Sequence, residues 1–123
     1  MKYPIPPLIA YLLPPAQLEY TQQYYGIFAE TIDRLYKTVS AIPNIGDTET
    51  ILDPPAYLHY YTGTVDYFIC EYDGKDTMFG KMKFAIYHPG EYEYHKFSLS
   101  NLKSNDFLQL DFSWVVPSAC VVV

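Results

Sequence analysis

The stretch VDYFICEYDGKDTMFGKMKFAIY, residues 65–87, decides the fold class of this chain. Its first part, residues 65–72, is a run rich in apolar and aromatic side chains. Residues 78–87 form a second run, in which Met82 and Phe84 alternate with Lys81 and Lys83. Between them, Asp73-Gly74 is a strong short-range signal for a β-hairpin, because Gly tolerates the positive φ that tight turns require. The stretch therefore predicts two antiparallel strands.

Three further strand-like runs flank this hairpin, each next to a turn signal such as Gly63 or His88-Pro89-Gly90: residues 57–62, 92–97 and 108–114. The last run alternates apolar and polar side chains, as a half-buried strand does. Between the last two runs, residues 98–103 are expected to form one helical turn with Ser98 as its cap. These runs predict a meandering antiparallel sheet of about five strands over residues 56–116.

The residues before the sheet carry the pattern of one amphipathic helix. Apolar side chains recur along residues 18–42 in steps of three, four and seven, which is the spacing of one helical face. Pro15 suits the first turn of a helix, and Pro43 stops it. We therefore expect a helix over residues 15–42 packed on the sheet, in an α+β fold that forms a single domain over residues 1–123.

An apolar arm, residues 1–14, is expected to pack on this domain. It is rich in proline, which lacks the N–H that a helix or a sheet needs. Residues 8–13 within it fit one short turn of helix. The arm has neither the length nor the cleavage site of a secretion signal, and no run in the chain approaches the length of a membrane span.

Tyrosine is unusually frequent, with 14 Tyr beside 7 Phe and 1 Trp. A small core cannot hide so many hydroxyl groups, because each needs a hydrogen-bond partner or water. Some of these tyrosines should therefore lie on the surface, where Tyr is enriched at binding interfaces. The alternative is that they are half-buried strand residues, since Tyr favours β-sheet.

The charge balance is acidic, with 14 Asp and Glu against 8 Lys and Arg and a net charge of −6. Contacts to phosphate need clustered Lys or Arg, so this balance argues against direct binding of nucleic acid. An acidic surface usually indicates only good solvation. Less often it indicates a basic protein partner, or competition for a site that normally holds nucleic acid.

Motifs for catalysis or metal binding are not recognisable in the sequence. His59, His88 and His95 lack the spacing of a zinc site, and Cys70 and Cys120 are far from them in sequence. Two cysteines do not make a disulfide framework, and the first is expected to be a small core residue. The last four residues, which begin at Cys120, match the loose pattern for prenylation, with an apolar tail or an added edge strand as the alternative. We predict no metal and no cofactor.

Acidic and tyrosine side chains are interleaved on two of the predicted strands and on the turn of the hairpin. Paired carboxylates can perform acid–base chemistry, but charged residues at strand edges also discourage aggregation. We propose the interleaved residues as a candidate face for binding a protein. They are Asp66, Tyr67, Glu71, Tyr72, Asp73, Asp76, Glu91, Tyr92, Glu93 and Tyr94.

A series of short landmarks runs through the second part of the chain: IPNIGDTE at residues 42–49, Asp53-Pro54, YFICEYD at residues 67–73, Phe79-Gly80 and FSLSNL at residues 97–102. Their order resembles the bacterial family catalogued as domain of unknown function 2958, small proteins often carried by plasmids and other mobile elements. The resemblance covers about residues 42–114 and implies a cytoplasmic protein of bacterial or mobile-element origin. It supplies no activity and no catalytic residues, and the arm and the first helix depart from the family pattern.

These observations favour a non-enzymatic interaction module, an anti-defence or accessory factor that binds a host protein. The partner is expected to be basic or nucleic-acid-binding, with the acidic and Tyr-bearing face covering its nucleic-acid site. Two alternatives stay open. One is a small hydrolase or nucleotide-modifying enzyme that uses carboxylates and a His from separate strands. The other is a self-associating structural module, a homo-oligomer built through the arm or the Val-rich tail.

Overall fold

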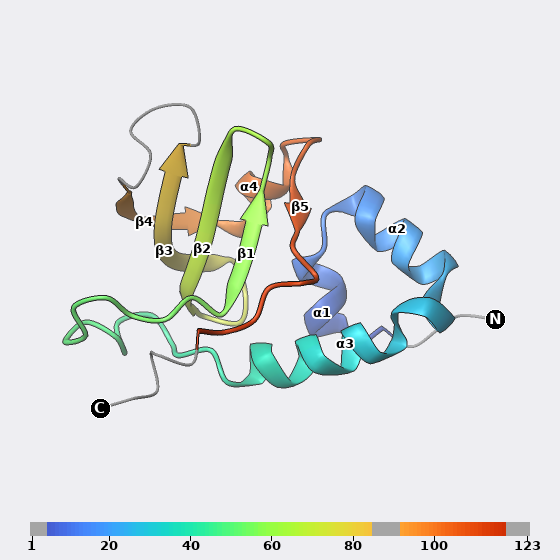
Figure 1. Ribbon diagram of the computed structural model, residues 1–123, viewed down its shortest axis with the longest axis horizontal. Helices are drawn as coiled ribbons and strands as arrows, with labels where there is room; N and C mark the ends of the chain where they lie inside the picture. Colours follow the sequence, from blue (N-terminus) through green and yellow to red (C-terminus); the bar gives the residue numbers. More distant parts are fainter. Residues whose placement is uncertain (1–4, 85–91, 118–123) are drawn as a thin grey trace.

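The computed structural model describes residues 5–84 and 92–117, in which helices lie beside a five-stranded antiparallel sheet (Figure 1). The strands are β1 (Leu58–Tyr61), β2 (Val65–Tyr72), β3 (Thr77–Phe84), β4 (Glu93–Ser98) and β5 (Gln109–Leu110). The helices are α1 (Pro7–Leu12), α2 (Pro15–Gln23), α3 (Tyr25–Ser40) and α4 (Leu99–Lys103). The predicted α+β class is confirmed. The predictions made for Glu91, for the turn at residues 88–90 and for the tail at Cys120 lie outside the described residues.

The strands are arranged in the order β4-β3-β2-β1-β5. The first four form the expected meander, in which each strand pairs with the next along the chain. The last strand, β5, instead lies antiparallel to β1 at the other edge, with Leu110 opposite Tyr60. The predicted helical turn is α4, and the Ser98 hydroxyl caps it by accepting a hydrogen bond from the N–H of Asn101 (3.2 Å).

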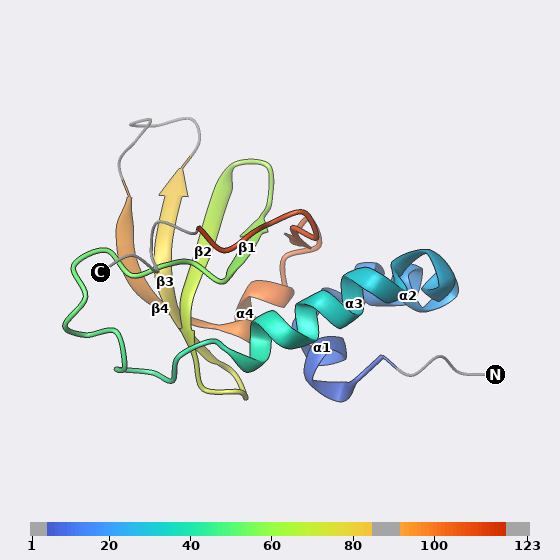
Figure 2. The same ribbon diagram turned by 60° about the horizontal axis from the view of Figure 1, so that its bottom comes forward.

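The helix predicted over residues 15–42 is divided into two in the structure. The chain leaves helical geometry at Tyr24, whose φ is −113° and ψ is 38°, so that α2 ends and α3 begins there. Gly26 follows immediately and favours a helix less than other residues do. The spacing of apolar residues did not indicate the break, because the predicted apolar stripe is carried almost entirely by α3, and Leu18 is its one member in α2. Figures 1 and 2 show α2 and the first turns of α3 projecting beyond the sheet.

One face of the sheet packs on the helices and forms the core. Tyr60 is fully buried there, and its hydroxyl donates a hydrogen bond to the carbonyl of Leu12 in α1 (2.6 Å). The arm thus packs on the domain as expected, at least from Ile5 onward. Apolar side chains from all parts of the fold meet at this helix-covered face, among them Ile9, Leu35, Leu58, Ile69, Met78, Leu99 and Leu110.

The opposite face of the sheet is covered by loops. Alternate strand residues point to it, including Phe68, which lies 5.4 Å from Trp114 of the chain after β5 (ring centroids). The connection between α3 and β1 crosses the same face and brings Asp53 to Tyr94, whose hydroxyl donates to that carboxylate (2.8 Å). We call this side the loop-covered face.

A β-bulge between Ile69 and Glu71 interrupts the pairing of β2 with β3. Gly80 faces this bulge, and a Cβ atom placed on it would lie 1.9 Å from the carbonyl oxygen of Phe68. Only glycine allows the two backbones to approach so closely. Cys70 within the bulge is fully buried, which confirms its prediction as a core residue.

Candidate functional site

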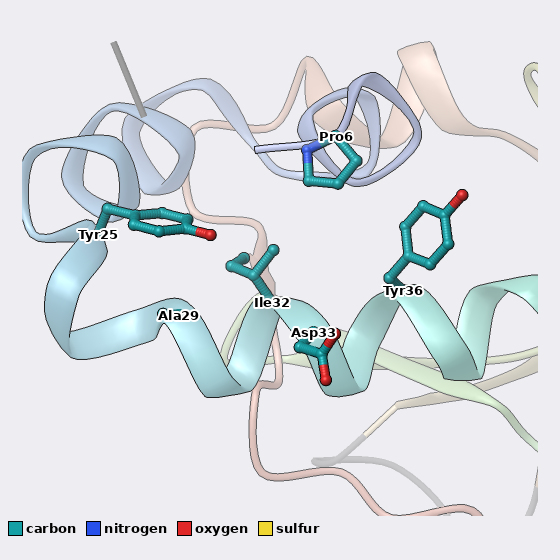
Figure 3. Close-up of a pocket in the computed structure, with 6 residues that line it drawn as sticks. All are labelled: Pro6, Tyr25, Ala29, Ile32, Asp33 and Tyr36. Carbon is teal, nitrogen blue, oxygen red and sulfur yellow. The ribbon is translucent and has the colours of Figure 1, made fainter. Parts of the chain in front are cut away.

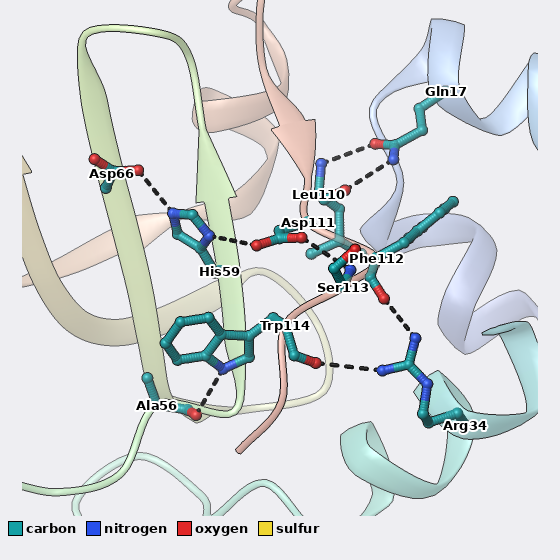
Figure 4. Close-up of polar contacts among 10 residues, drawn as sticks. All are labelled: Gln17, Arg34, Ala56, His59, Asp66, Leu110, Asp111, Phe112, Ser113 and Trp114. Carbon is teal, nitrogen blue, oxygen red and sulfur yellow. Dashed lines mark hydrogen bonds and ion pairs between the residues drawn. The ribbon is translucent and has the colours of Figure 1, made fainter. Parts of the chain in front are cut away.

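The chain that contains and follows β5, residues 109–114, is held on both sides by side chains from other elements (Figure 4). We call residues 109–114 the β5 segment. On its sheet side, Asp111 meets His59, and the indole N–H of Trp114 donates to the carbonyl of Ala56 (3.0 Å). On its helix side, Gln17 and Arg34 bond to its backbone. The segment is therefore fixed across its whole width.

His59 lies between two carboxylates on the loop-covered face. Its Nδ1 is 2.9 Å from Asp111 Oδ2, and its Nε2 is 2.7 Å from Asp66 Oδ1. An ionised carboxylate can only accept, so both contacts are hydrogen bonds only when both ring nitrogens carry hydrogen. The His59 ring thus joins β1, β2 and the β5 segment. Because both nitrogens are used within the protein, neither is free to take a proton from a ligand.

Aromatic rings surround this histidine. The His59 ring stacks on Phe68, with ring centroids 4.7 Å apart and planes 9° from parallel. Trp114 covers both rings, at 5.4 Å from each. The side chain of His59 is only 14% exposed. The rings cover the imidazole, whereas the Asp66 and Asp111 side chains stay 33% and 26% exposed.

The outer edge of the β5 segment is closed by side chains from the helices. The Gln17 carboxamide donates to the Leu110 carbonyl (2.9 Å) and accepts from the Leu110 N–H (2.8 Å). The Arg34 guanidinium donates to the carbonyls of Phe112 and Trp114. An edge strand would otherwise expose these backbone groups. Side chains therefore occupy the positions that a neighbouring strand would take.

A cleft of about 420 Å³ lies between α2 and the β5 segment. Of the described residues that line it, Asp111 alone carries a charge. The rings of Tyr20 and Phe28 lie 5.8 Å apart, and those of Phe28 and Phe112 lie 5.6 Å apart. The lining consists of Ala16, Gln17, Tyr20, Thr21, Phe28, Tyr61 and residues 109–113.

The cleft opens onto an exposed aromatic corner where α2 meets α3. Tyr24 and Ile27 are 41% and 75% exposed, and Tyr20 is 55% exposed. The rings of Tyr20 and Tyr24 lie 4.8 Å apart, so the corner continues the aromatic wall of the cleft. Residues 15–33 include acidic side chains but no Lys or Arg. The corner therefore presents large apolar groups in acidic surroundings.

Two other clefts have linings with fewer features that suit binding. The first, about 390 Å³, lies where Pro6 faces α3 (Figure 3). Its one carboxylate, Asp33, pairs with Lys37 at 3.4 Å. The second, about 250 Å³, lies between the α3–β1 connection and the rings of Phe79 and Tyr94. The first has no strand residue in its lining, and the second has two, Phe79 and Tyr94, but no run of consecutive strand residues like that of the cleft beside α2.

The residues predicted as one binding face are distributed over both faces of the sheet. Asp66 points to the loop-covered face and bonds to His59. Its neighbour Tyr67 points to the other face and packs on Phe97 at 5.3 Å, and burial raises its pKa. This separation follows from the alternation of side chains along a strand.

Glu71 and Tyr72 are buried, also on opposite faces. Glu71 accepts hydrogen bonds from the N–H groups of Gly46 and Thr48 (2.8 Å each) and from the Thr48 hydroxyl, which anchors the α3–β1 connection. Burial opposes ionisation of Glu71, but these hydrogen bonds outweigh it and lower its pKa. Burial, with the charge of Asp73 nearby, raises the pKa of Tyr72 to about 12.

The acids of the hairpin turn hold local structure. Asp73 accepts hydrogen bonds from three N–H groups of its own turn, beginning with that of Lys75 (2.8 Å). Asp76 accepts from the Ser98 hydroxyl (2.7 Å) and the Ser100 N–H (2.7 Å), which ties the turn to α4. Hydrogen bonds lower the pKa of both carboxylates. The largest contribution comes from the Lys75 N–H for Asp73 and from the Ser98 hydroxyl for Asp76.

The described members on β4 are again divided. Glu93 bonds to His95 at 2.8 Å and is exposed. Tyr94 is half-buried on the loop-covered face, where burial and then the hydrogen bond to Asp53 raise its pKa. Tyr92 lies beneath Lys81, whose Nζ is 4.6 Å from the ring centroid. The described residues of the set therefore do not share one surface, and Glu91 lies outside the described part of the chain.

The residues that fix the β5 segment, two of which belong to it, lie outside the predicted set. They are Gln17, Arg34, His59, Asp111 and Trp114. Alternation alone places His59 on the same face as Tyr57 and Tyr61, and it places Asp111 on the opposite side of the predicted run 108–114 from Leu110 and Phe112. What it does not give is the pairing of β5 with β1, which brings the two together. For Gln17 and Arg34 the sequence carried no signal beyond their place on a helix.

Chemistry beyond hydrogen bonding has few candidates in this structure. Across residues 5–84 and 92–117, no group of three or more His, Cys, Asp or Glu side chains is arranged to hold a metal ion. No helix in the same ranges has the length and apolar character needed to cross a membrane. His95, the second histidine in these ranges, lines none of the three clefts.

No protein-family model, curated protein or solved structure matches this chain. The cleft beside α2 is therefore interpreted from its own geometry.

Proposed function

We propose that the chain is a small acidic protein-interaction module that binds a partner protein in the cleft between α2 and the β5 segment. The observation that carries this proposal is the aromatic wall of that cleft, which continues onto the exposed rings of Tyr20 and Tyr24. Aromatic residues supply most of the binding energy in many interfaces, above all where they line a pocket. Because both sides of the β5 segment are already fixed, little ordering is needed when a partner binds.

The charge around the cleft favours a basic partner. Asp111 lies in the lining, Glu19 and Glu30 lie on the adjoining helices, and the chain carries a net charge of −6. Complementary charges steer association and discriminate against wrong partners. The family resemblance adds a biological setting, in which the module is an anti-defence or accessory factor of a mobile element. The partner would then be a host protein, and the module would cover its nucleic-acid site.

An enzymatic role has weaker support in the geometry. A general base needs a nitrogen or oxygen that can reach a substrate proton. Both nitrogens of His59 are bonded to carboxylates, and His95 lies away from the clefts and bonds to Glu93. The cleft beside α2 offers hydrogen-bonding groups and rings, which suit recognition.

The test compares two tyrosine variants in affinity capture from a bacterial lysate. Tyr20→Ala removes a ring of the cleft wall, and Tyr36→Ala removes a similarly exposed ring outside this cleft (55% and 45% exposed). A partner retained by the wild type and by Tyr36→Ala should bind Tyr20→Ala at least about tenfold more weakly. A partner that binds Tyr20→Ala as tightly as the wild type, or that is lost with Tyr36→Ala instead, would contradict the proposal.

A further inference from the structure

We infer that the cleft takes an extended peptide, which pairs its backbone with Leu110 at the place that the Gln17 carboxamide occupies in the free protein. This inference rests on the proposed function and names the form of the partner, an unstructured or loop segment that adds a strand to the sheet. It also assigns Gln17 a role as an internal competitor for that place.

The first argument is the chemistry of the contact at Leu110. A carboxamide carries the same donor and acceptor as a peptide group. Gln17 uses both, at 2.9 and 2.8 Å, on the carbonyl and N–H of one residue at the edge of the sheet. The pair of bonds matches what a residue of an adjacent antiparallel strand makes. Gln17 thus stands in for the N–H and C=O of one residue of a strand that the free protein lacks.

The second argument is the shape of the cleft. One wall consists of five consecutive residues, 109–113, so the cleft follows an extended segment along its length. The other wall is one face of α2, formed by Ala16, Gln17, Tyr20 and Thr21. A groove between a helix and an edge strand is the setting in which several domains bind extended peptides by strand addition.

The third argument concerns the side chains of the incoming peptide. Successive side chains of a strand point in opposite directions. One set would meet the rings of Tyr20, Phe28 and Phe112, which favours large apolar residues at alternate positions. The other set would face outward, where Glu19 and Glu30 on the adjoining helices and the net charge of −6 favour Lys or Arg. The peptide that fits is therefore extended, alternating and basic.

Arg34 limits where the pairing can occur. Its guanidinium already donates to the carbonyls of Phe112 and Trp114. A peptide continuing past Leu110 in that direction would have to compete with a charged donor, whose hydrogen bonds are stronger than neutral ones. Pairing should therefore be confined to the vicinity of Leu110, with only one or two peptide groups of the ligand taking part.

The experiment uses a phage-displayed library of random linear peptides selected on the full chain. The best peptide is then synthesised, together with analogues that each carry one N-methylated backbone nitrogen. Dissociation constants are measured by fluorescence polarisation for the wild type, Tyr20→Ala, Gln17→Ala and Gln22→Ala. Gln22 is an exposed glutamine on the same helix. N-methylation removes a donor without removing a side chain, so it reports backbone pairing directly.

We expect N-methylation at one site, the residue opposite Leu110, to weaken binding about tenfold, with little effect elsewhere. Gln17→Ala should tighten binding about tenfold because it removes the competing carboxamide, whereas Gln22→Ala should leave it unchanged. Gln17→Glu offers a second variant, since it keeps the acceptor for the Leu110 N–H and loses the donor. The N-methyl series needs no protein variant, so the inference stays testable if Gln17→Ala fails to fold.

The outcomes separate this inference from the proposed function. Peptides that depend on Tyr20 but tolerate N-methylation at every position would overturn strand addition and leave the binding cleft in place. A library that yields no Tyr20-dependent peptide would overturn the inference altogether, while the capture experiment with folded partner proteins would still judge the proposed function.

Discussion

On one face of the sheet, Ile69 and Met78 are fully buried under helices, whereas on the other face Glu71 and His59 hold loops through hydrogen bonds and ion pairs. The strands that carry these residues are the same, so the two faces share one backbone and differ in what stabilises them. Burial of apolar groups does not depend on protonation. Hydrogen bonds and ion pairs to carboxylates do depend on protonation, because they weaken when the carboxylate is protonated. Acid should therefore release the loops more readily than the helices.

The helix-covered face should give the largest single effect. Ile69→Ala removes a side chain with no exposure from the middle of β2 and leaves a cavity. We expect a loss of about 3 kcal/mol in the free energy of unfolding, equal at neutral and at acidic pH. Urea unfolding followed by circular dichroism measures it. Ile51→Ala, at a side chain that is 49% exposed, is the control and should cost far less. A loss that varied strongly with pH would contradict the proposed difference between the faces.

On the loop-covered face, Glu71→Gln should have a smaller effect that depends on pH. The native pKa of Glu71 is lowered, so its contribution is present above the unfolded pKa of about 4.3 and is lost as pH falls through the native value. We expect the variant to be about 2 kcal/mol less stable at neutral pH. The difference from the wild type should shrink below about pH 4. Glu49→Gln, at an exposed position of the same connection, should show neither effect. A difference in stability between the variant and the wild type that persisted in acid would show that Glu71 acts through packing.

The smallest effect is expected at the edge of the loop-covered face. Asp53 pairs with Lys81 at 2.9 Å, but its side chain is 60% exposed. Solvent weakens such a pair. Asp53→Asn should therefore lower the free energy of unfolding by only about 0.5 kcal/mol, and by less at high salt. Thermal unfolding at low and high salt measures it, with Asp106→Asn at another exposed site as the control. A cost as large as that of Glu71→Gln would mean that exposed ion pairs stabilise this face as well.

Much of the sheet could be predicted because its signals are local. The Asp73-Gly74 turn, the strand residues on either side and the Ser98 cap each depend on a few neighbouring residues. The break at Tyr24 could not be read from the spacing of apolar residues, since nearly all of the apolar stripe lies in α3. The predicted binding set grouped Asp66 with Tyr67, although alternation alone puts them on opposite faces.

The site itself depends on pairings across long stretches of chain. His59 meets Asp111 only because β5 lies beside β1, and Gln17 meets Leu110 only because α2 lies beside β5. A single sequence carries no signal for either pairing. The sequence shows the types of these residues, but it does not show which of them contact one another in the fold.

The position of β5 also has a consequence for the order of folding. Each hairpin from β1 to β4 closes a short loop, whereas His59 and Asp111 are separated by 52 residues and Gln17 and Leu110 by 93. Distant contacts form more slowly, because the chain must first lose the entropy of closing a long loop. Trp114, the single tryptophan, lies in the segment that these contacts fix, so its fluorescence should report the slowest phase of refolding. A nascent chain would acquire its hairpins early and its binding cleft last.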